Sequence, residues 1–327
     1  MAAGLLAGCS QTRPPATVAI HQTSTFQAVA IIDRQYVESR LGAPSSQAAA
    51  RDGSFRPVSF CLGPGGTMVI ADRGAGRLMM LPAPAGDSAR SATPGLETSA
   101  IGDPGCVRLD PIGNVYACGS RGDRLEIFDP RLRAAGKVDL PAADQGLADG
   151  HAVAIAFGPL GDIVVADEGN ARVDCFDASG RYQSGFDGGE SAPWGRLIRP
   201  AGVAVHPDGN SLYVCDPGAR RVVIFDREGT PLRSLSFDGA FDPVAVAVDN
   251  RGQVYVADRG GKRVIIFGAD DRALVTIDEA SPGHPWVEPT DLAVAGALVW
   301  VADPGAGRIV ALRLVLSEAE GSEPEVR

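Results

Sequence analysis

The stretch VYVADRGGKRVIIF at residues 254–267 decides the fold, because close copies of it recur along the chain. Two apolar runs, typical of strands, flank a short polar turn. Four close copies are MVIADRGAGRLMML from Met68, IVVADEGNARVDCF from Ile163, LYVCDPGARRVVIF from Leu212 and VWVADPGAGRIVAL from Val299. A weaker copy, VYACGSRGDRLEIF, begins at Val115. Six copies of one hairpin predict an internal repeat.

The first strand of each copy ends at a position that is aspartate in five of the six. The aligned residues are Asp72, Gly119, Asp167, Asp216, Asp258 and Asp303, and their successive numbers differ by 47, 48, 49, 42 and 45. Five positions later comes an arginine in every copy: Arg77, Arg124, Arg172, Arg221, Arg263 and Arg308. Aspartate accepts backbone N–H bonds in turns, and an arginine nearby can pair with it. We therefore expect these residues to hold the turn of each repeat rather than to form one active site. In the second copy Arg124 needs another partner or points to solvent.

Besides the two strands of the hairpin, each repeat carries one strand upstream and one downstream. The upstream strands are PVSFCL from Pro57, PGCVRL from Pro104, AVAIAF from Ala152, PAGVAV from Pro200, PVAVAV from Pro243 and PTDLAV from Pro289. Downstream, a strand such as RVVIFD is followed by a more polar one such as PLRSLSF. Four short strands in about 45 residues predict a propeller blade, which buries its faces only when several blades close into a ring.

Residues 200–225, PAGVAVHPDGNSLYVCDPGARRVVIF, resemble the consensus of the NHL-repeat β-propellers, and the resemblance covers residues 57–313. It implies an all-β fold, a six-bladed β-propeller of four-stranded antiparallel blades. The family usually has asparagine three residues after the aspartate, and only Asn170 keeps it. The last blade lacks a fourth strand, so an N-terminal strand from residues 26–42 is expected to close the ring. Both 26–32 and 36–41 are candidates.

The innermost strands alternate bulky and small residues. One position holds Phe60, Val107, Ile155, Val203, Val246 and Leu292, and the next holds Cys61, Arg108, Ala156, Ala204, Ala247 and Ala293. Successive strand residues face opposite sides, so the bulky face of one blade is expected to pack on the small face of its neighbour. Arg108 breaks this pattern, and it is either turned into the central channel or is a local defect.

Cys106 and Cys118 lie on neighbouring strands and could face each other. In exported proteins such a pair can become oxidised. A disulfide and a pair of buried thiols are therefore both possible states of these two cysteines.

The N-terminal sequence MAAGLLAGCS resembles the lipobox of bacterial lipoproteins, in which a lipid is attached to a cysteine, here Cys9. The expected organisation is a truncated signal at 1–9, a tether at 10–25, one propeller at 26–316 and an acidic disordered tail at 317–327. This predicts a protein of the bacterial cell envelope, held at the membrane through a lipid anchor on its extracytoplasmic face. No apolar run approaches the roughly 20 residues that span a bilayer. The net charge of −10 argues against a nucleic-acid partner.

In a propeller, the residues that precede the inner strands gather at one mouth of the channel. All six of them are ionisable here: Arg56, Asp103, His151, Arg199, Asp242 and Glu288. Arg108 is expected beneath them, and Asp291 lies near the same mouth. These residues are either a solvated rim or a polar funnel for a ligand. His151 is the one histidine among them.

Three functional classes compete. The first is a binding or scaffold module for a protein or small ligand at the channel mouth. The second is an enzyme of the peptide-amidating lyase type, whose fold is similar and which uses a zinc ion held by histidines. Of the four histidines in this chain, only His151 is expected at the mouth. The third, a lactonase-like metal hydrolase, needs converging carboxylates, for which Asp103, Asp242, Glu288 and Asp291 are candidates. The binding module is favoured, with no catalytic residue, metal ligand or cofactor assigned and a divalent cation in the channel left open.

Overall fold

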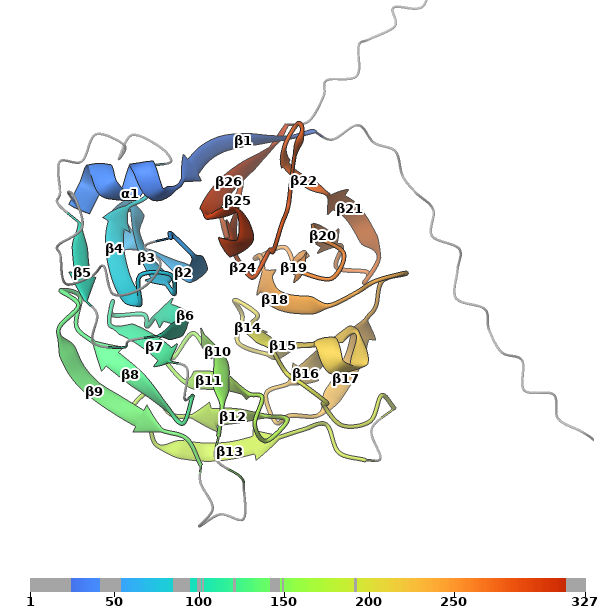
Figure 1. The fold of residues 1–327 in the computed structure, drawn as a ribbon. Coiled ribbons are helices and arrows are strands. Elements are labelled where there is room, and N and C mark those ends of the chain that lie inside the picture. The colour runs from blue at the N-terminus through green and yellow to red at the C-terminus, as the bar shows by residue number, and fades with distance from the viewer. Residues whose placement is uncertain are drawn as a thin grey trace, which may run out of the picture.

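The computed structural model describes residues 25–41, 54–84, 95–98, 101, 103–119, 122–141, 148, 150–190 and 193–315. Within these residues, six four-stranded antiparallel sheets stand around a ring (Figure 1). The predicted all-β fold and the predicted six blades are therefore confirmed. The predicted signal segment, the acidic tail and all of the tether except Thr25 lie outside the described residues, and so does Cys9.

Each blade runs in chain order from an inner strand beside the channel to an outer strand at the edge of the ring. Blade 1 comprises β2 (Pro57–Gly63), β3 (Thr67–Asp72), β4 (Arg77–Pro82) and β5 (Leu96–Thr98). Blade 2 comprises β6 (Pro104–Leu109), β7 (Val115–Gly119), β8 (Arg124–Phe128) and β9 (Ala134–Asp139). Blade 3 comprises β10 (Ala152–Phe157), β11 (Ile163–Asp167), β12 (Arg172–Phe176) and β13 (Tyr182–Phe186).

The next two blades repeat this order, and the sixth takes its outer strand from the N-terminal part of the chain. Blade 4 comprises β14 (Gly202–Val205), β15 (Ser211–Asp216), β16 (Arg221–Asp226) and β17 (Pro231–Leu235). Blade 5 comprises β18 (Pro243–Val248), β19 (Val254–Asp258), β20 (Arg263–Phe267) and β21 (Ala273–Ile277). Blade 6 comprises β24 (Asp291–Ala295), β25 (Leu298–Asp303), β26 (Arg308–Val315) and β1 (Thr25–Ile32). The short pair β22 (Glu279–Ser281) and β23 (His284–Pro285) lies between the last two blades in the chain.

The ring closes through β1, which pairs antiparallel with β26 from Thr25 opposite Val315 to Ile32 opposite Ile309. The prediction that an N-terminal strand completes the last blade is therefore confirmed for the first candidate segment. The second candidate is not a strand, because residues Arg34–Leu41 form the helix α1. Asp33 starts this helix by accepting a hydrogen bond from the Tyr36 N–H at 2.9 Å, as an N-cap residue does.

Apolar side chains fill the spaces between neighbouring blades. On one side of β2, Phe60 packs in a cluster with Trp300 of blade 6, and on the other side Cys61 packs in a cluster with Val107 of blade 2. The bulky and small positions of this inner strand thus serve two different neighbours. Fully burying one such large side chain contributes about 1.5–3 kcal/mol, so each blade depends on the blades beside it.

A disulfide joins β6 to β7 within blade 2. Cys106 and Cys118 are directly paired residues of the two strands, with their Cα atoms 5.2 Å apart. Among the described cysteines, Cys61, Cys175 and Cys215 are free thiols. Short 3-10 helices fill three of the turns: η2 (Pro64–Gly66), η5 (Pro217–Ala219) and η6 (Pro304–Ala306). Within the described ranges, none of the helices has the length and apolar character needed to cross a membrane.

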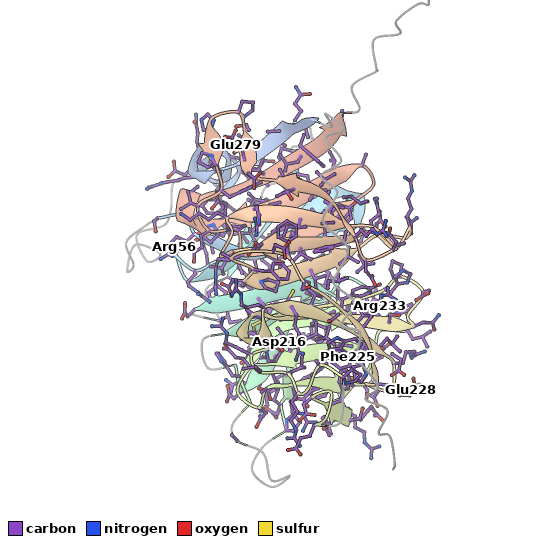
Figure 2. The ribbon with its side chains drawn as sticks, turned by 90° about the vertical axis from the view of Figure 1, so that its right-hand side faces the viewer. Arg56, Asp216, Phe225, Glu228, Arg233 and Glu279 are labelled. Atoms are coloured by element: carbon purple, nitrogen blue, oxygen red, sulfur yellow. A yellow bond between two sulfur atoms is a disulfide. The ribbon has the colours of Figure 1, made fainter. Side chains whose placement is uncertain are left out.

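The ring has two faces, which we name by the direction of the inner strands. The entry face carries the residues just before the inner strands, including Arg56. The exit face carries the turns that follow the inner strands and those that precede the outer strands. Figure 2 shows the ring from its side, with Arg56 on one face and Glu228 and Arg233 on the other.

Candidate functional site

Buried aspartates fix the backbone at the entry face. In five blades the aspartate at the end of the second strand is almost fully buried, and its Oδ1 accepts the N–H of the residue that precedes the inner strand. The donors are Arg56 to Asp72 at 3.0 Å, His151 to Asp167 at 2.8 Å, Arg199 to Asp216 at 2.9 Å, Asp242 to Asp258 at 2.8 Å and Glu288 to Asp303 at 2.8 Å. Five of the six ionisable residues at the predicted mouth are thus held by one repeated hydrogen bond.

In four blades the arginine five residues on pairs with the same aspartate. These ion pairs are Asp72–Arg77 at 3.4 Å, Asp216–Arg221 at 3.0 Å, Asp258–Arg263 at 2.8 Å and Asp303–Arg308 at 3.0 Å. In blade 2, where Gly119 replaces the aspartate, Arg124 pairs with Glu126 at 2.6 Å. The repeated Asp–Arg pair therefore belongs to the blade turns, because each pair stays within its own blade.

Blade 3 departs from this arrangement. Asn170 donates its amide to Asp167 at 2.8 Å, while Arg172 lies 2.8 Å from Asp174 on the same strand. The expected pairing of Arg172 with Asp167 is replaced, because a second carboxylate lies closer to the guanidinium. Burial raises the pKa of Asp174 from 3.8 to about 7, against the opposing effect of Arg172.

The side chains of the entry face form ion pairs, several of which link neighbouring blades. Arg56 and Glu288 lie 3.8 Å apart, Arg73 and Asp103 3.6 Å, Arg199 and Asp242 3.3 Å, and Arg259 and Asp242 3.0 Å. The imidazole of His151 lies 3.3 Å from Glu168. Both signs of charge therefore alternate around this face. Their side chains are all part-exposed, so the charges remain available to a partner in solution.

Arg108 crosses the channel to Asp291, from blade 2 to blade 6. Its two terminal nitrogens donate to the two carboxylate oxygens of Asp291 at 2.8 Å each. Ser59 of blade 1 lies between them: its hydroxyl donates to Asp291 at 2.6 Å and accepts from Arg108 at 3.1 Å. Burial acts to lower the pKa of Arg108, but the charge and hydrogen bond of Asp291 raise it. Arg108 is thus turned into the channel, where a bidentate pair ties three blades together.

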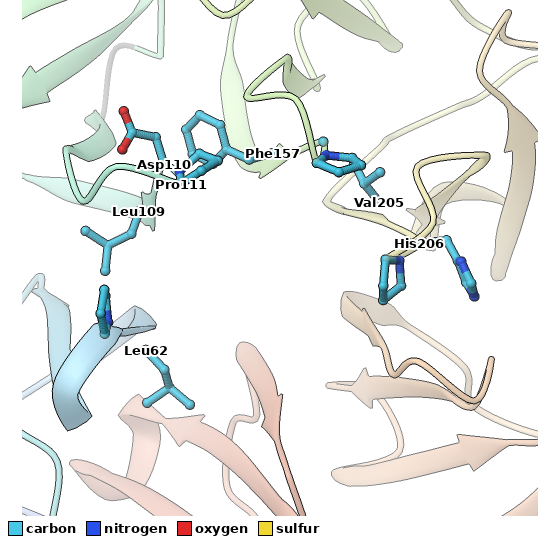
Figure 3. Close-up of a pocket in the computed structure, with 11 residues that line it drawn as sticks. Leu62, Leu109, Asp110, Pro111, Phe157, Val205 and His206 are labelled. Carbon is cyan, nitrogen blue, oxygen red and sulfur yellow. The ribbon is translucent and has the colours of Figure 1, made fainter.

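The two ends of the channel differ in size. Near the entry face, the channel holds a cavity of about 40 Å³ lined by Ser59, Arg108, Asp291 and neighbouring backbone. At the exit face it widens into a cavity of about 350 Å³ (Figure 3). This second cavity was not predicted from the sequence. Its signal was an apolar residue near the end of the inner strand, followed two positions later by proline in blades 1 to 4, as in LGP at 62–64 and FGP at 157–159.

The four carboxylates considered for a lactonase-like site each face their own arginine. Arg73 pairs with Asp103, Arg199 and Arg259 with Asp242, Arg56 with Glu288, and Arg108 with Asp291. In each pair the arginine neutralises a carboxylate charge that would otherwise attract a metal ion. Within the part of the chain that the structure describes, no three His, Cys, Asp or Glu side chains group in a way that could hold a metal ion.

Comparisons with known proteins agree with this architecture. Residues 242–267 match the NHL repeat family model. A search of curated protein sequences gives no match. The ring is similar to virginiamycin B lyase from Staphylococcus aureus, with 12% identity, a TM-score of 0.60 and coverage of 89% of this chain and 100% of that chain. It is also similar to a streptogramin B lyase, with 13% identity, a TM-score of 0.58 and coverage of 90% and 99%. Hydrazine synthase of Kuenenia stuttgartiensis gives 14% identity, a TM-score of 0.58 and coverage of 84% and 100%. At such identities the likeness concerns the fold alone. The protein is a six-bladed β-propeller that carries an NHL repeat.

Proposed function

We propose that the protein is a binding module that recognises another protein through its charged entry face. The observation that carries this proposal is the repeated hydrogen bond from a buried aspartate to the residue before each inner strand. It fixes the backbone under the charged side chains while leaving those side chains part-exposed. Alternating charges on a rigid base favour specific association with a surface of complementary charge.

The size of the channel favours a protein partner over a small ligand at this face. The cavity near the entry face measures about 40 Å³, far below the roughly 300–1,000 Å³ typical of small-molecule sites. The ion pair between Arg108 and Asp291 forms part of its lining. A partner at this face therefore contacts the rim itself, as the surface of another protein can.

We further propose that the module is exported and lipid-anchored through Cys9. The described chain begins at β1 on the outer edge of blade 6, and residues 10–24 connect this strand to Cys9. Fifteen residues span at most about 50 Å when extended, which allows the ring to stand clear of a membrane surface. Mass spectrometry of the mature protein should find a lipid on Cys9, and Cys9→Ser should release the protein from the membrane fraction. An unmodified N-terminus in the native host would refute the anchor.

Two matched arginines test the entry face. Arg199 pairs with Asp242 at 3.3 Å on the entry face, and Arg233 pairs with Asp271 at 2.9 Å on the exit face. Their side chains are similarly exposed, at 45% and 42%. The same substitution at the two sites therefore changes charge equally while altering opposite faces.

The experiment uses the two charge reversals on the full chain. Partners are first cross-linked to the wild-type protein in the native host and purified with it. The affinity of the identified partner is then measured by titration at several salt concentrations. Arg199→Glu should weaken its binding about tenfold or more, and the wild-type affinity should fall as salt rises. Arg233→Glu should leave binding unchanged. Equal effects from both variants, or none from Arg199→Glu, would show that the entry face is not the binding surface.

A further inference from the structure

The exit face opens into an apolar funnel that lies outside the proposed protein-binding surface. The last apolar side chains of the inner strands in blades 1 to 4 line the cavity of about 350 Å³: Leu62, Leu109, Phe157 and Val205. The residues at the same position in the last two blades, Val248 and Val294, are apolar as well. All six side chains are only half-buried, although most valines and leucines on the second and third strands of the blades are almost fully buried. The ring therefore leaves apolar surface open to solvent at one end of its channel.

The rim of this funnel is apolar too. The turns of blades 1 to 4 begin with exposed prolines that line the cavity: Pro64, Pro111, Pro159 and Pro207. Ile112 and Leu160 follow two of these prolines and are the most exposed large apolar side chains of the described chain, at 82% and 80%. Single exposed apolar residues are common, but a contiguous apolar patch around a cavity marks a binding site.

The two ionisable residues at the funnel are engaged elsewhere. Asp110 accepts the N–H groups of Ile112 and Asn114 at 3.0 and 2.8 Å and the Asn114 side chain at 2.8 Å. His206 lies 2.8 Å from Asp208 through its Nδ1. Figure 3 shows both side chains pointing away from the centre of the cavity, while Leu62 and Phe157 border it. Among the described residues that line the funnel, both ionisable side chains therefore already have partners, and neither is directed at a ligand in the cavity.

We infer that the funnel binds an uncharged, largely apolar small molecule. The volume lies at the lower end of the roughly 300–1,000 Å³ typical of small-molecule sites, which fits a compact ring system rather than a long chain. A charged group buried there would lose its water without gaining a partner, and that loss is costly. The site is distinct from the cavity near the entry face, because the two cavities share no lining residue and the Arg108–Asp291 pair lines only the smaller one.

The test uses N-phenyl-1-naphthylamine, an uncharged aromatic compound whose fluorescence rises in apolar surroundings. Titration should show saturable binding with one site per folded chain. Its anionic analogue, 8-anilino-1-naphthalenesulfonate, has the same rings with a sulfonate and should bind about tenfold more weakly. The entry-face variant Arg199→Glu should bind the neutral probe as the wild type does, which separates this site from the proposed protein-binding function.

Two variants with opposite chemistry locate the probe. Leu109→Asp places a charge in the funnel, and Val205→Phe fills it with an apolar ring; each should weaken binding of the neutral probe about tenfold or more. The matched control is Leu232→Asp, which changes an exposed leucine on the outer strand of blade 4 and should have no effect. Thermal unfolding checks that each variant is folded. If Leu109→Asp does not fold, the result with Val205→Phe decides the question. Absence of saturable binding, wild-type affinity in the funnel variants, or an equal loss in Leu232→Asp would overturn the inference.

Discussion

Replacing Asp216 by alanine removes a blade aspartate that accepts from four donors, as Asp303 does in blade 6. Its Oδ1 accepts the N–H groups of Ile198 and Arg199 at 3.1 and 2.9 Å. Its Oδ2 accepts two N–H groups of Arg221 at 3.2 and 3.0 Å. The carboxylate is fully buried, so Asp216→Ala leaves all four donors without this acceptor and without ready access to water.

The expected loss of stability is about 3 kcal/mol. Breaking a buried ion pair from one side typically costs about 3–5 kcal/mol. Arg221 keeps part of its hydrogen bonding, because it also donates to the carbonyls of Trp194 and Arg196, and this places the estimate at the lower end. For a domain of this size such a loss lowers the melting temperature by roughly 6–12 °C. Asp216→Asn, which keeps an acceptor for the backbone donors, should lose about half as much.

The measurement is unfolding in urea, monitored by tryptophan fluorescence, and the control is Asp242→Ala. Asp242 also pairs with arginines, at 3.3 and 3.0 Å, but it lies part-exposed on the entry face. Exposed pairs contribute about 0–1 kcal/mol, so the control should unfold close to the wild type. If Asp216→Ala costs no more than Asp242→Ala, the buried aspartates do not hold the blades.

Three further outcomes follow from the structure. Burial raises the pKa of Asp174 from 3.8 to about 7, so between these values the folded chain holds a proton that the unfolded chain has lost. Stability should therefore fall as the pH rises through this window, by about 1.4 kcal/mol per pH unit, and urea midpoints of Asp174→Asn at pH 5 and pH 8 should show a smaller difference than the wild type. Reducing the disulfide between Cys106 and Cys118, which are 12 residues apart, should cost about 3 kcal/mol, and unchanged urea midpoints with and without reductant would contradict this. Deleting residues 1–32 removes β1 and exposes the edge of β26, so light scattering should detect association of the truncated chain, whereas a stable monomer would contradict the role of β1 in closing the ring.

The blades and their number could be predicted from the sequence because the same buried residues recur in every repeat. An aspartate that ends a strand and an arginine five residues later interact within one blade. Because these partners are close in sequence, the repeat pattern alone predicts their contact. The closing strand was predictable for a related reason, since five blades supply four strands each and the sixth supplies three. The helix α1 was missed, although Asp33 is a recognisable N-cap residue.

The contents of the channel could not be predicted in the same way. Arg108 and Asp291 are 183 residues apart, and the repeat pattern marks Arg108 only as an exception without naming its partner. Asp174 is a similar case, because the aligned residues in blades 4 and 5, Val223 and Ile265, are apolar. The pairing of Arg108 depends on which side chains meet across blades, and the register of a single blade does not contain that information. Asp174 pairs with Arg172 on its own strand, and what the repeat does not reveal is that this carboxylate is fully buried.

Blade 2 shows how the ring tolerates the loss of a repeated contact. Gly119 stands where the other blades have aspartate, although its nearest neighbour would lie 3.4 Å from an added Cβ, so lack of space does not explain the glycine. Without that carboxylate, the N–H of Asp103 bonds to the Ile101 carbonyl at 2.7 Å instead. The disulfide of Cys118 lies one residue before Gly119 and joins the same two strands, and Arg108 of this blade ties it to blades 1 and 6 through Ser59 and Asp291. A covalent bond and a pair that crosses the channel thus replace a hydrogen bond within the blade, which makes blade 2 the part of the ring whose stability depends on oxidation and on its neighbours.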